Sequence, residues 1–173
     1  MKVCILPALA LSGLAVLSGC TSDSGNPAQP TFYASMADAG ATVDAAAAAS
    51  MISGYRSNNS LGAVEVDPDL MRMAMDHAHT MAAKDKVDHA AGREFTGRLA
   101  AAGFDGKVAV ENVSAGYHTL AEAFSGWRDS PPHRANMLKD AVNRIGIATV
   151  YAPGSKYKVF WALIMAAKGE GRG

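Results

Sequence analysis

Two histidines and one glutamate occupy positions at which a rigid scaffold can hold reactive or binding side chains. His89 follows the end of an expected helix, and His133 follows two prolines in Ser130-Pro131-Pro132-His133-Arg134. Glu111 comes at the end of an expected strand and precedes Asn112. Imidazole and carboxylate groups can act as general acids or bases, and loops and element ends often carry such groups. Spacing alone leaves two interpretations open, a shared site or an ordinary loop histidine beside a common Glu-Asn pair.

The other three histidines have simpler interpretations. His77 and His79 are two positions apart on an expected helix, so they point to different sides and cannot chelate one ion together. His77 falls on the apolar stripe and is interpreted as a core or edge residue with satisfied hydrogen bonds. His79 and His118 are interpreted as solvated surface groups. The sequence contains neither a Gly-x-Ser-x-Gly elbow nor a His-Glu-x-x-His helix, so no familiar hydrolase motif supplies a nucleophile or a metal.

Capping residues and apolar periodicity predict the helices that would position these groups. Asp67 is a plausible N-cap, Pro68 suits the first helical position, and an apolar stripe with helical spacing runs from Leu70 to Met81. Thr119 forms a capping box with Glu122. Helices are therefore expected over 45–56, from 68 to a last turn closed by Lys84 and Lys86, over 94–102, and from 120 through at least 127.

The strands are expected mainly in the C-terminal part. Residues 108–110 form a short β-branched run before Glu111, and 145–151 and 157–166 form two longer runs around a Pro-Gly turn. Both faces of the longer runs are apolar, which is typical of central strands covered on both sides. Helices first and a hairpin last predict an α+β fold, a three-layer α-β-α sandwich with the sheet between helices.

Length and charge limit the classes of function. The chain has 173 residues, with 16 Lys and Arg against 16 Asp and Glu. A neutral balance argues against a nucleic-acid partner, which needs a surplus of basic groups. Hydrophobic residues make up 49% but aromatic residues only 7%, which is enough for one lean core in a single domain.

The first twenty residues predict export and anchoring. Residues 1–19 form an expected lipoprotein signal peptide, because a short basic start precedes an apolar run that is too short to span a membrane. Leu17-Ser18-Gly19-Cys20 resembles a bacterial lipobox, which implies lipidation of Cys20 and a membrane as partner; the alternative is a plain cleaved signal with an incidental cysteine. Thr21 in place of Asp favours the outer membrane if the host is Gram-negative. Acylation would use the only cysteine left after cleavage and so exclude an intrachain disulfide.

The predicted domain boundaries follow from composition. Residues 20–40 are rich in Ser, Pro, Gly and Ala without a sustained period and are expected to form a flexible tether. The single domain is expected over 41–168, and 169–173 form a short tail.

Four segments resemble the bacterial branch of the CAP superfamily, which includes cysteine-rich secretory proteins, antigen 5 and plant pathogenesis-related proteins. They are Asp88-His89, Glu111-Asn112, the run WRDSPPHRANML over 127–138, and Ile145-Gly146-Ile147. The resemblance covers about 43–167 and implies the same three-layer fold. It also implies a central cleft that binds zinc or another divalent cation through His89, Glu111 and His133. Two imidazoles and a carboxylate would leave a fourth position open to water.

The sequence departs from the family pattern in ways that bear on function. Ser130 stands where many members have a second acidic residue, Val110 stands where a Gly is usual before Glu-Asn, and Ser53 replaces a common Asn. Loss of the second acid weakens a carboxylate-pair hydrolase more than a metal site. The first hypothesis is therefore an envelope-anchored binding module for a divalent cation, a lipid or a cell-wall ligand. The alternatives are a hydrolase with Glu111 or a histidine as base, and a purely structural envelope protein.

Overall fold

The computed structural model describes residues 29–104 and 108–167. The expected signal peptide over 1–19, Cys20 as the expected lipidation site and the expected tail over 169–173 lie outside the described residues. The elements are η1 (Thr31–Tyr33), α1 (Ala45–Ser57), β1 (Glu65–Val66), α2 (Pro68–Ala83), α3 (Phe95–Ala101), β2 (Ala109–Ala115), α4 (Leu120–Asp129), α5 (Pro131–Met137), β3 (Arg144–Ala152) and β4 (Lys158–Ala166).

The helix starts follow from side-chain caps. Asp44 accepts a hydrogen bond from the Ala47 amide at 2.9 Å at the start of α1. Asp67 accepts from the first amides of α2, and Thr119 accepts from the Glu122 amide at the start of α4. Such caps satisfy amides that have no partner within the helix. Lys84 is the C-cap of α2, and Lys86 lies beyond the helix, so α2 ends earlier than the two lysines suggest.

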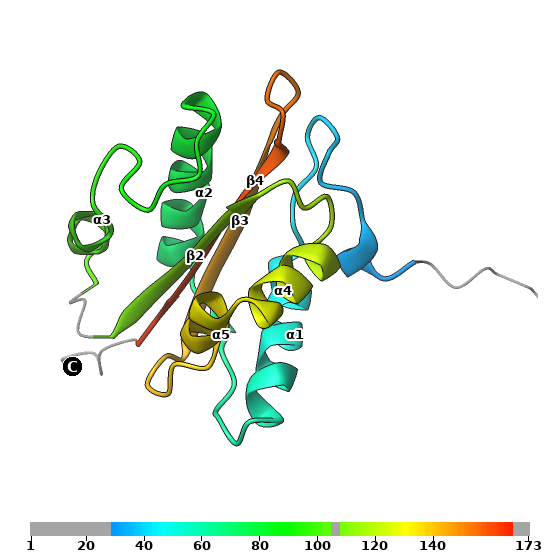
Figure 1. Ribbon diagram of the computed structural model, residues 1–173. Coiled ribbons are helices and arrows are strands. Elements are labelled where there is room, and N and C mark those ends of the chain that lie inside the picture. Colours follow the sequence, from blue (N-terminus) through cyan, green and yellow to red (C-terminus); the bar gives the residue numbers. More distant parts are fainter. Residues whose placement is uncertain (1–28, 105–107, 168–173) are drawn as a thin grey trace, which may run out of the picture.

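The sheet is mixed and has the strand order β1-β3-β4-β2. β4 pairs antiparallel with both β3 and β2, whereas β1 pairs parallel with β3. Figure 1 shows α2 and α3 on one side of the sheet and α1, α4 and α5 on the other. The expected α+β class and three-layer sandwich are confirmed, and β2 is an edge strand of this sheet.

Two hydrophobic cores lie on the two faces of the sheet. β4 serves both, since successive side chains of a strand point to opposite faces. Val159, Trp161, Leu163 and Met165 pack with α1 and α4, and Phe160, Ala162, Ile164 and Ala166 pack with α2. Trp127 of α4 stacks edge-on against Trp161 with ring centroids 6.2 Å apart.

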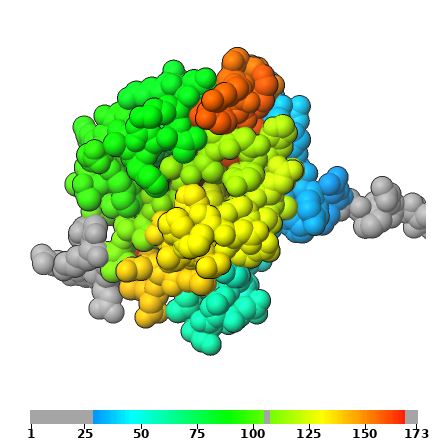
Figure 2. Space-filling view, in the orientation of Figure 1, coloured from blue at the N-terminus to red at the C-terminus, as the bar shows by residue number. Residues whose placement is uncertain are grey.

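In the space-filling view the yellow α4–α5 segment occupies the middle of one face (Figure 2). Within the described residues, no helix is both long and apolar enough to cross a membrane.

A buried arginine connects α1 to the loop between α5 and β3. The Arg56 guanidinium donates to the Gly62 carbonyl and to four carbonyls of that loop region. Burial lowers the Arg56 pKa from its ordinary value. Because five carbonyls replace water around it, the cation can remain in the interior.

The packed structure begins before residue 41. Residues 31–33 form η1, and the Met36 side chain is buried in the core that contains α1 and α4. The Met36 amide donates to the His118 carbonyl at 2.7 Å. The predicted tether over 20–40 is therefore too long at its C-terminal end, because Met36 with its backbone hydrogen bond, and the partly buried Phe32 and Ala37, hold this segment to the domain.

Two local predictions near the candidate site are corrected. Glu111 lies inside β2, paired in register with Ile164 of β4, rather than at the end of a strand. His133 lies on α5 rather than in a loop. Prolines suit the first turn of a helix because its amides lack intrahelical partners in any case. Pro131 and Pro132 therefore begin a helix here instead of stiffening a loop.

Candidate functional site

The alternation of β2 sends two neighbouring polar side chains to opposite faces of the sheet. Val113 of β2 belongs to the α2 core, and Val110 packs on the α1–α4 core. By this alternation Glu111 faces α2 and α3, whereas Asn112 faces α5. Both residues are buried. The site thus extends around a free edge of the sheet and draws residues from both outer layers.

The Glu111 carboxylate is held by three side chains from separate segments. Oε1 lies 2.9 Å from His89 Nδ1 and 3.7 Å from His77 Nε2. Oε2 lies 2.7 Å from Arg98 Nη2. Only 2% of the Glu111 side chain is exposed, whereas 59% of His89 is exposed. Glu111 therefore connects the buried side chain of His77 and the largely buried side chain of Arg98 to the solvent-accessible imidazole of His89. These four residues form the Glu111 cluster.

Arg98 holds both the carboxylate and the loop that carries His89. Its Nη2 donates to the His89 carbonyl at 2.9 Å, and its Nε donates to the Arg93 carbonyl at 3.2 Å. The contact of Nη2 with Glu111 is an ion pair rather than an aligned hydrogen bond. Sequence reasoning missed Arg98. The available signal was that a carboxylate buried in a strand requires a cation nearby, and Arg98 lies between His89 and Glu111 in the chain.

His77 is buried as predicted, but its hydrogen bonds are not satisfied. Neither ring nitrogen makes a hydrogen bond to any residue that the structure describes. Burial lowers the His77 pKa, and the charges of Arg98 and His89 lower it further, against the opposite effect of Glu111. The Asp88 backbone lies near the ring and raises the pKa by the smallest amount, although no hydrogen bond of acceptable geometry joins it to His77. His77 is thus part of the Glu111 cluster, a role that its place on an apolar stripe concealed.

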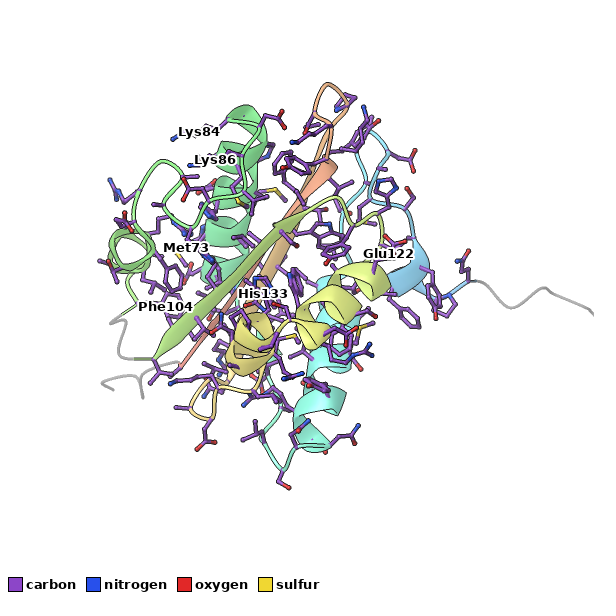
Figure 3. All side chains as sticks on the ribbon, viewed as in Figure 1. Met73, Lys84, Lys86, Phe104, Glu122 and His133 are labelled. Atoms are coloured by element: carbon purple, nitrogen blue, oxygen red, sulfur yellow. The ribbon has the colours of Figure 1, made fainter. Side chains whose placement is uncertain are left out.

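A pair of asparagines clamps α5, with His133, against β2. The Asn136 side-chain amide donates to the Glu111 carbonyl at 2.9 Å and to Asn112 Oδ1 at 2.8 Å. The Asn112 amide donates to the His133 carbonyl at 3.0 Å. His133 projects from α5, which lies beside β2 (Figure 3). Glu111-Asn112 and the His-Arg-x-Asn part of α5 therefore form one interlocked unit.

The two candidate imidazoles lie near enough to interact. The His133 pKa is lowered, chiefly by burial and then by the positive charge of His89. A neutral imidazole nitrogen is the form that binds a metal ion. Because His89 uses Nδ1 for Glu111, its Nε2 remains as the nitrogen that can face a ligand. The structure thus places His89 against Glu111, and His133 within electrostatic reach of His89.

His89, Glu111 and His133, the predicted metal ligands, fit a metal ion only in part. Among the residues described, no three His, Cys, Asp or Glu side chains form a group that could hold a metal ion as they stand. Glu111 Oε1 and Oε2 are already in contact with His89 and Arg98. His89 and His133 retain the nitrogen chemistry that zinc prefers. The ligand set of His89, Glu111 and His133 stays a prediction, with Glu111 the member whose surroundings fit direct coordination least.

Comparisons with known proteins bear on the family and the fold. The model of the Cysteine-rich secretory protein family, CAP, matches residues 49–165. Among solved structures, an extracellular protein with an SCP domain from Bacillus anthracis is 21% identical with a TM-score of 0.62. An outer surface protein of Borrelia burgdorferi is 17% identical with a TM-score of 0.63, and a cysteine-rich secretory protein of Staphylococcus aureus is 16% identical with a TM-score of 0.59. A search of curated proteins gave no match.

The coverage of these structures differs. The matches to the Bacillus and Staphylococcus proteins each cover 71% of this chain, and the match to the Borrelia protein covers 75%. The chain spans 40% of the Bacillus protein and 38% of the Staphylococcus protein, but 98% of the Borrelia protein. At these identities the likeness establishes a shared fold and leaves activity to be argued from the site.

Proposed function

Because the chain belongs to the CAP family of cysteine-rich secretory proteins, we propose that it is a cell-envelope binding module that holds a divalent cation at the edge of β2. His89 and His133 are the proposed ligands. Zinc is the first candidate, since two neutral imidazoles suit its preference for nitrogen donors. A bound divalent cation would act as a Lewis acid and lower the pKa of a bound water.

The observation that carries the proposal is the 2.9 Å contact between His89 Nδ1 and Glu111 Oε1. Metal-binding histidines commonly donate their second ring N–H to a carboxylate, which fixes the tautomer and the ring orientation. Glu111 is buried and can serve His89 in this way. In this arrangement Glu111 orients a ligand rather than acting as one, which differs from the role that the family resemblance implies.

Arg98 and the two asparagines supply the rigidity that such a site needs. Arg98 fixes the other carboxylate oxygen and the His89 carbonyl. Asn112 and Asn136 fix the backbone on which His133 is carried. Preorganised ligands lose less conformational entropy when an ion binds.

The alternative function is a hydrolase in which Glu111 is the general base. With 2% of its side chain exposed, Glu111 can meet a water or substrate only if His89 or Arg98 moves away. No contact among the described residues favours this function over metal binding. Turnover of a peptide or cell-wall substrate that is abolished by Glu111→Gln would support the hydrolase, and turnover that survives would remove Glu111 as the base.

The envelope location rests on the signal-like start and on Cys20, the proposed site of lipidation and the proposed link to a membrane. Two of the similar structures belong to proteins described as extracellular or outer surface proteins. Incorporation of radiolabelled palmitate into the wild-type chain, and the loss of this incorporation in Cys20→Ser, tests this part. A lipid or cell-wall molecule is a further proposed ligand of the site formed by His89, Glu111 and His133.

Zinc titration of the full chain by calorimetry tests the metal site. His89→Ala and His133→Ala should each reduce the zinc affinity at least about 100-fold, and Glu111→Gln about 10- to 100-fold, as expected of an orienting carboxylate. His79→Ala is the matched control, because His79 is exposed on α2. Equal affinity in the wild type, His89→Ala and His133→Ala would overturn the proposal.

A further inference from the structure

A second candidate binding site lies in a pocket between α2 and the segment that contains α3. Its volume is about 370 Å³, which falls within the range of small-molecule sites. One wall is α2, with Met73 and Asp76, and the other includes Arg93, Arg98 and Ala101. His77 also lines it. The pocket therefore reaches the Glu111 cluster from the side of the sheet opposite to α5.

Two of the cations around this pocket already have anionic partners. Arg72 forms an ion pair with Asp69 within α2, and Arg98 forms one with Glu111. Arg93 and Asp76 also line the pocket, and neither forms an ion pair with another described residue. Both are exposed. One cation and one carboxylate thus remain free to bind a ligand at the pocket.

The inner wall of the pocket carries buried polar atoms that lack partners. Arg98 Nη1 makes no hydrogen bond to any described residue, although only 10% of the Arg98 side chain is exposed. Both ring nitrogens of His77 are also buried and make no hydrogen bond to any described residue. Buried donors without acceptors are uncommon and costly. Arg98 Nη1 is enclosed as the side chain stands, so a ligand oxygen would supply the missing acceptor after a small turn of the Arg98 side chain toward the pocket that it lines.

We propose that this pocket binds a small zwitterion of the amino-acid type with an apolar side chain. The carboxylate of the ligand binds Arg93 and Arg98 Nη1, and its ammonium group binds Asp76. Its side chain packs against Met73 and Ala101, which form part of the apolar wall. Two opposite charges on one compact ligand match the two unpaired groups, whereas a simple anion would leave Asp76 without a partner and beside a new negative charge.

The proposal does not depend on the metal site. Neither His89 nor His133 lines the pocket, and Glu111 lies between the two sites through its contacts with His77, Arg98 and His89. Zinc affinity and zwitterion affinity are therefore separate measurements, and failure of one leaves the other standing.

The test is titration of the full chain with L-leucine and with leucyl-leucine. Binding is measured by isothermal titration calorimetry and by NMR. We expect a dissociation constant at or below about 1 mM for at least one of the two. For leucine, 4-methylpentanoate lacks the ammonium group and 3-methylbutylamine lacks the carboxylate. Each should bind at least about tenfold more weakly, because each leaves one charged group of the pocket unpaired.

Variants locate the binding. Arg93→Gln and Asp76→Asn should each weaken binding at least about tenfold and leave zinc affinity unchanged, since both residues are exposed and neither forms an ion pair with another described residue. Arg128→Gln is the control, because Arg128 is an exposed arginine on α4. The proposal is overturned if both zwitterions bind with dissociation constants above about 1 mM, if 4-methylpentanoate binds as tightly as leucine, or if neither variant weakens binding.

Discussion

Glu111 is the residue on which the candidate site depends, because His77, His89 and Arg98 contact its carboxylate from α2, from a loop and from α3. A buried carboxylate with a single nearby guanidinium is sensitive to the loss of that cation. The single-residue predictions therefore concern the two interior partners, Arg98 and His77.

Arg98→Met should destabilise the protein by about 3–5 kcal/mol, because the buried Glu111 carboxylate loses its guanidinium partner and keeps only the two imidazoles beside it. Urea unfolding followed by circular dichroism measures the change. The double variant Arg98→Met with Glu111→Gln should recover part of this loss, since it removes the uncompensated charge. Arg128→Met is the control, because the Arg128–Asp129 ion pair is exposed. If Arg98→Met unfolds at the same urea concentration as the wild type, the ion pair with Glu111 does not stabilise the fold.

The lowered pKa of His77 predicts a loss of stability as the pH falls below 7. The folded state holds this imidazole neutral below the ordinary value of 6.5, chiefly through burial and against the pull of Glu111. The unfolded chain therefore binds a proton first, and stability falls from about pH 6.5 down to the folded pKa. The free energy of unfolding measured between pH 7.5 and pH 5 should depend less steeply on pH in His77→Gln than in the wild type.

The control for this measurement is His79→Gln, an exposed position on the same helix. Arg98, His89 and Glu111 remain in place in both variants, so the comparison isolates His77. His133, whose pKa is lowered as well, gives all three proteins a common residual slope. An identical slope in the wild type and in His77→Gln would contradict the prediction.

At the scale of elements, α2 packs on β3 without a side chain between them at one point. A Cβ built on Gly146 would overlap the main-chain carbonyl of Leu70 in α2. This close approach brings α2, and with it His77, down onto the sheet. On the other face, the Asn112–Asn136 contact holds α5 to β2. The positions of both helices that flank Glu111 are therefore set by contacts at the backbone level.

Gly146→Ala should destabilise the protein by about 1–3 kcal/mol or more, because the overlap is with backbone that cannot rotate away. Thermal unfolding provides the measurement. Gly54→Ala is the matched control, since Gly54 lies within α1 and an added Cβ meets no atom within 4 Å. It should be neutral or stabilising by up to about 1 kcal/mol, as alanine is the better helix former. Equal stability of the two variants would show that α2 can shift at no cost.

The elements were largely predictable because their signals are local. Asp44, Asp67 and Thr119 cap the helices that follow them, and apolar runs predicted β3 and β4. The errors arose where a local signal had two meanings. Pro131 suits both a loop and a helix start, and the Ser-rich and Pro-rich stretch before residue 41 gave no sign that Met36 would be buried.

At the scale of the whole molecule, the candidate site forms only when both outer layers are packed on the sheet. His77 and Arg98 come from one layer and His133 from the other. The family motifs predicted His89, Glu111 and His133, but not His77 or Arg98, since charge pairing inside a core depends on contacts between segments distant in the chain. The same layering places the charged α2–α3 pocket behind Glu111 and the proposed metal site at the free edge of β2.

The most direct test of the metal site is a crystal of the protein soaked in zinc, with data collected at the zinc absorption edge. A cation held by His89 and His133 predicts one strong anomalous peak at the edge of β2, about 2.0–2.1 Å from a ring nitrogen of each histidine. Anomalous density that is absent from this edge at saturating zinc, or that lies against only one of the two imidazoles, would contradict the account.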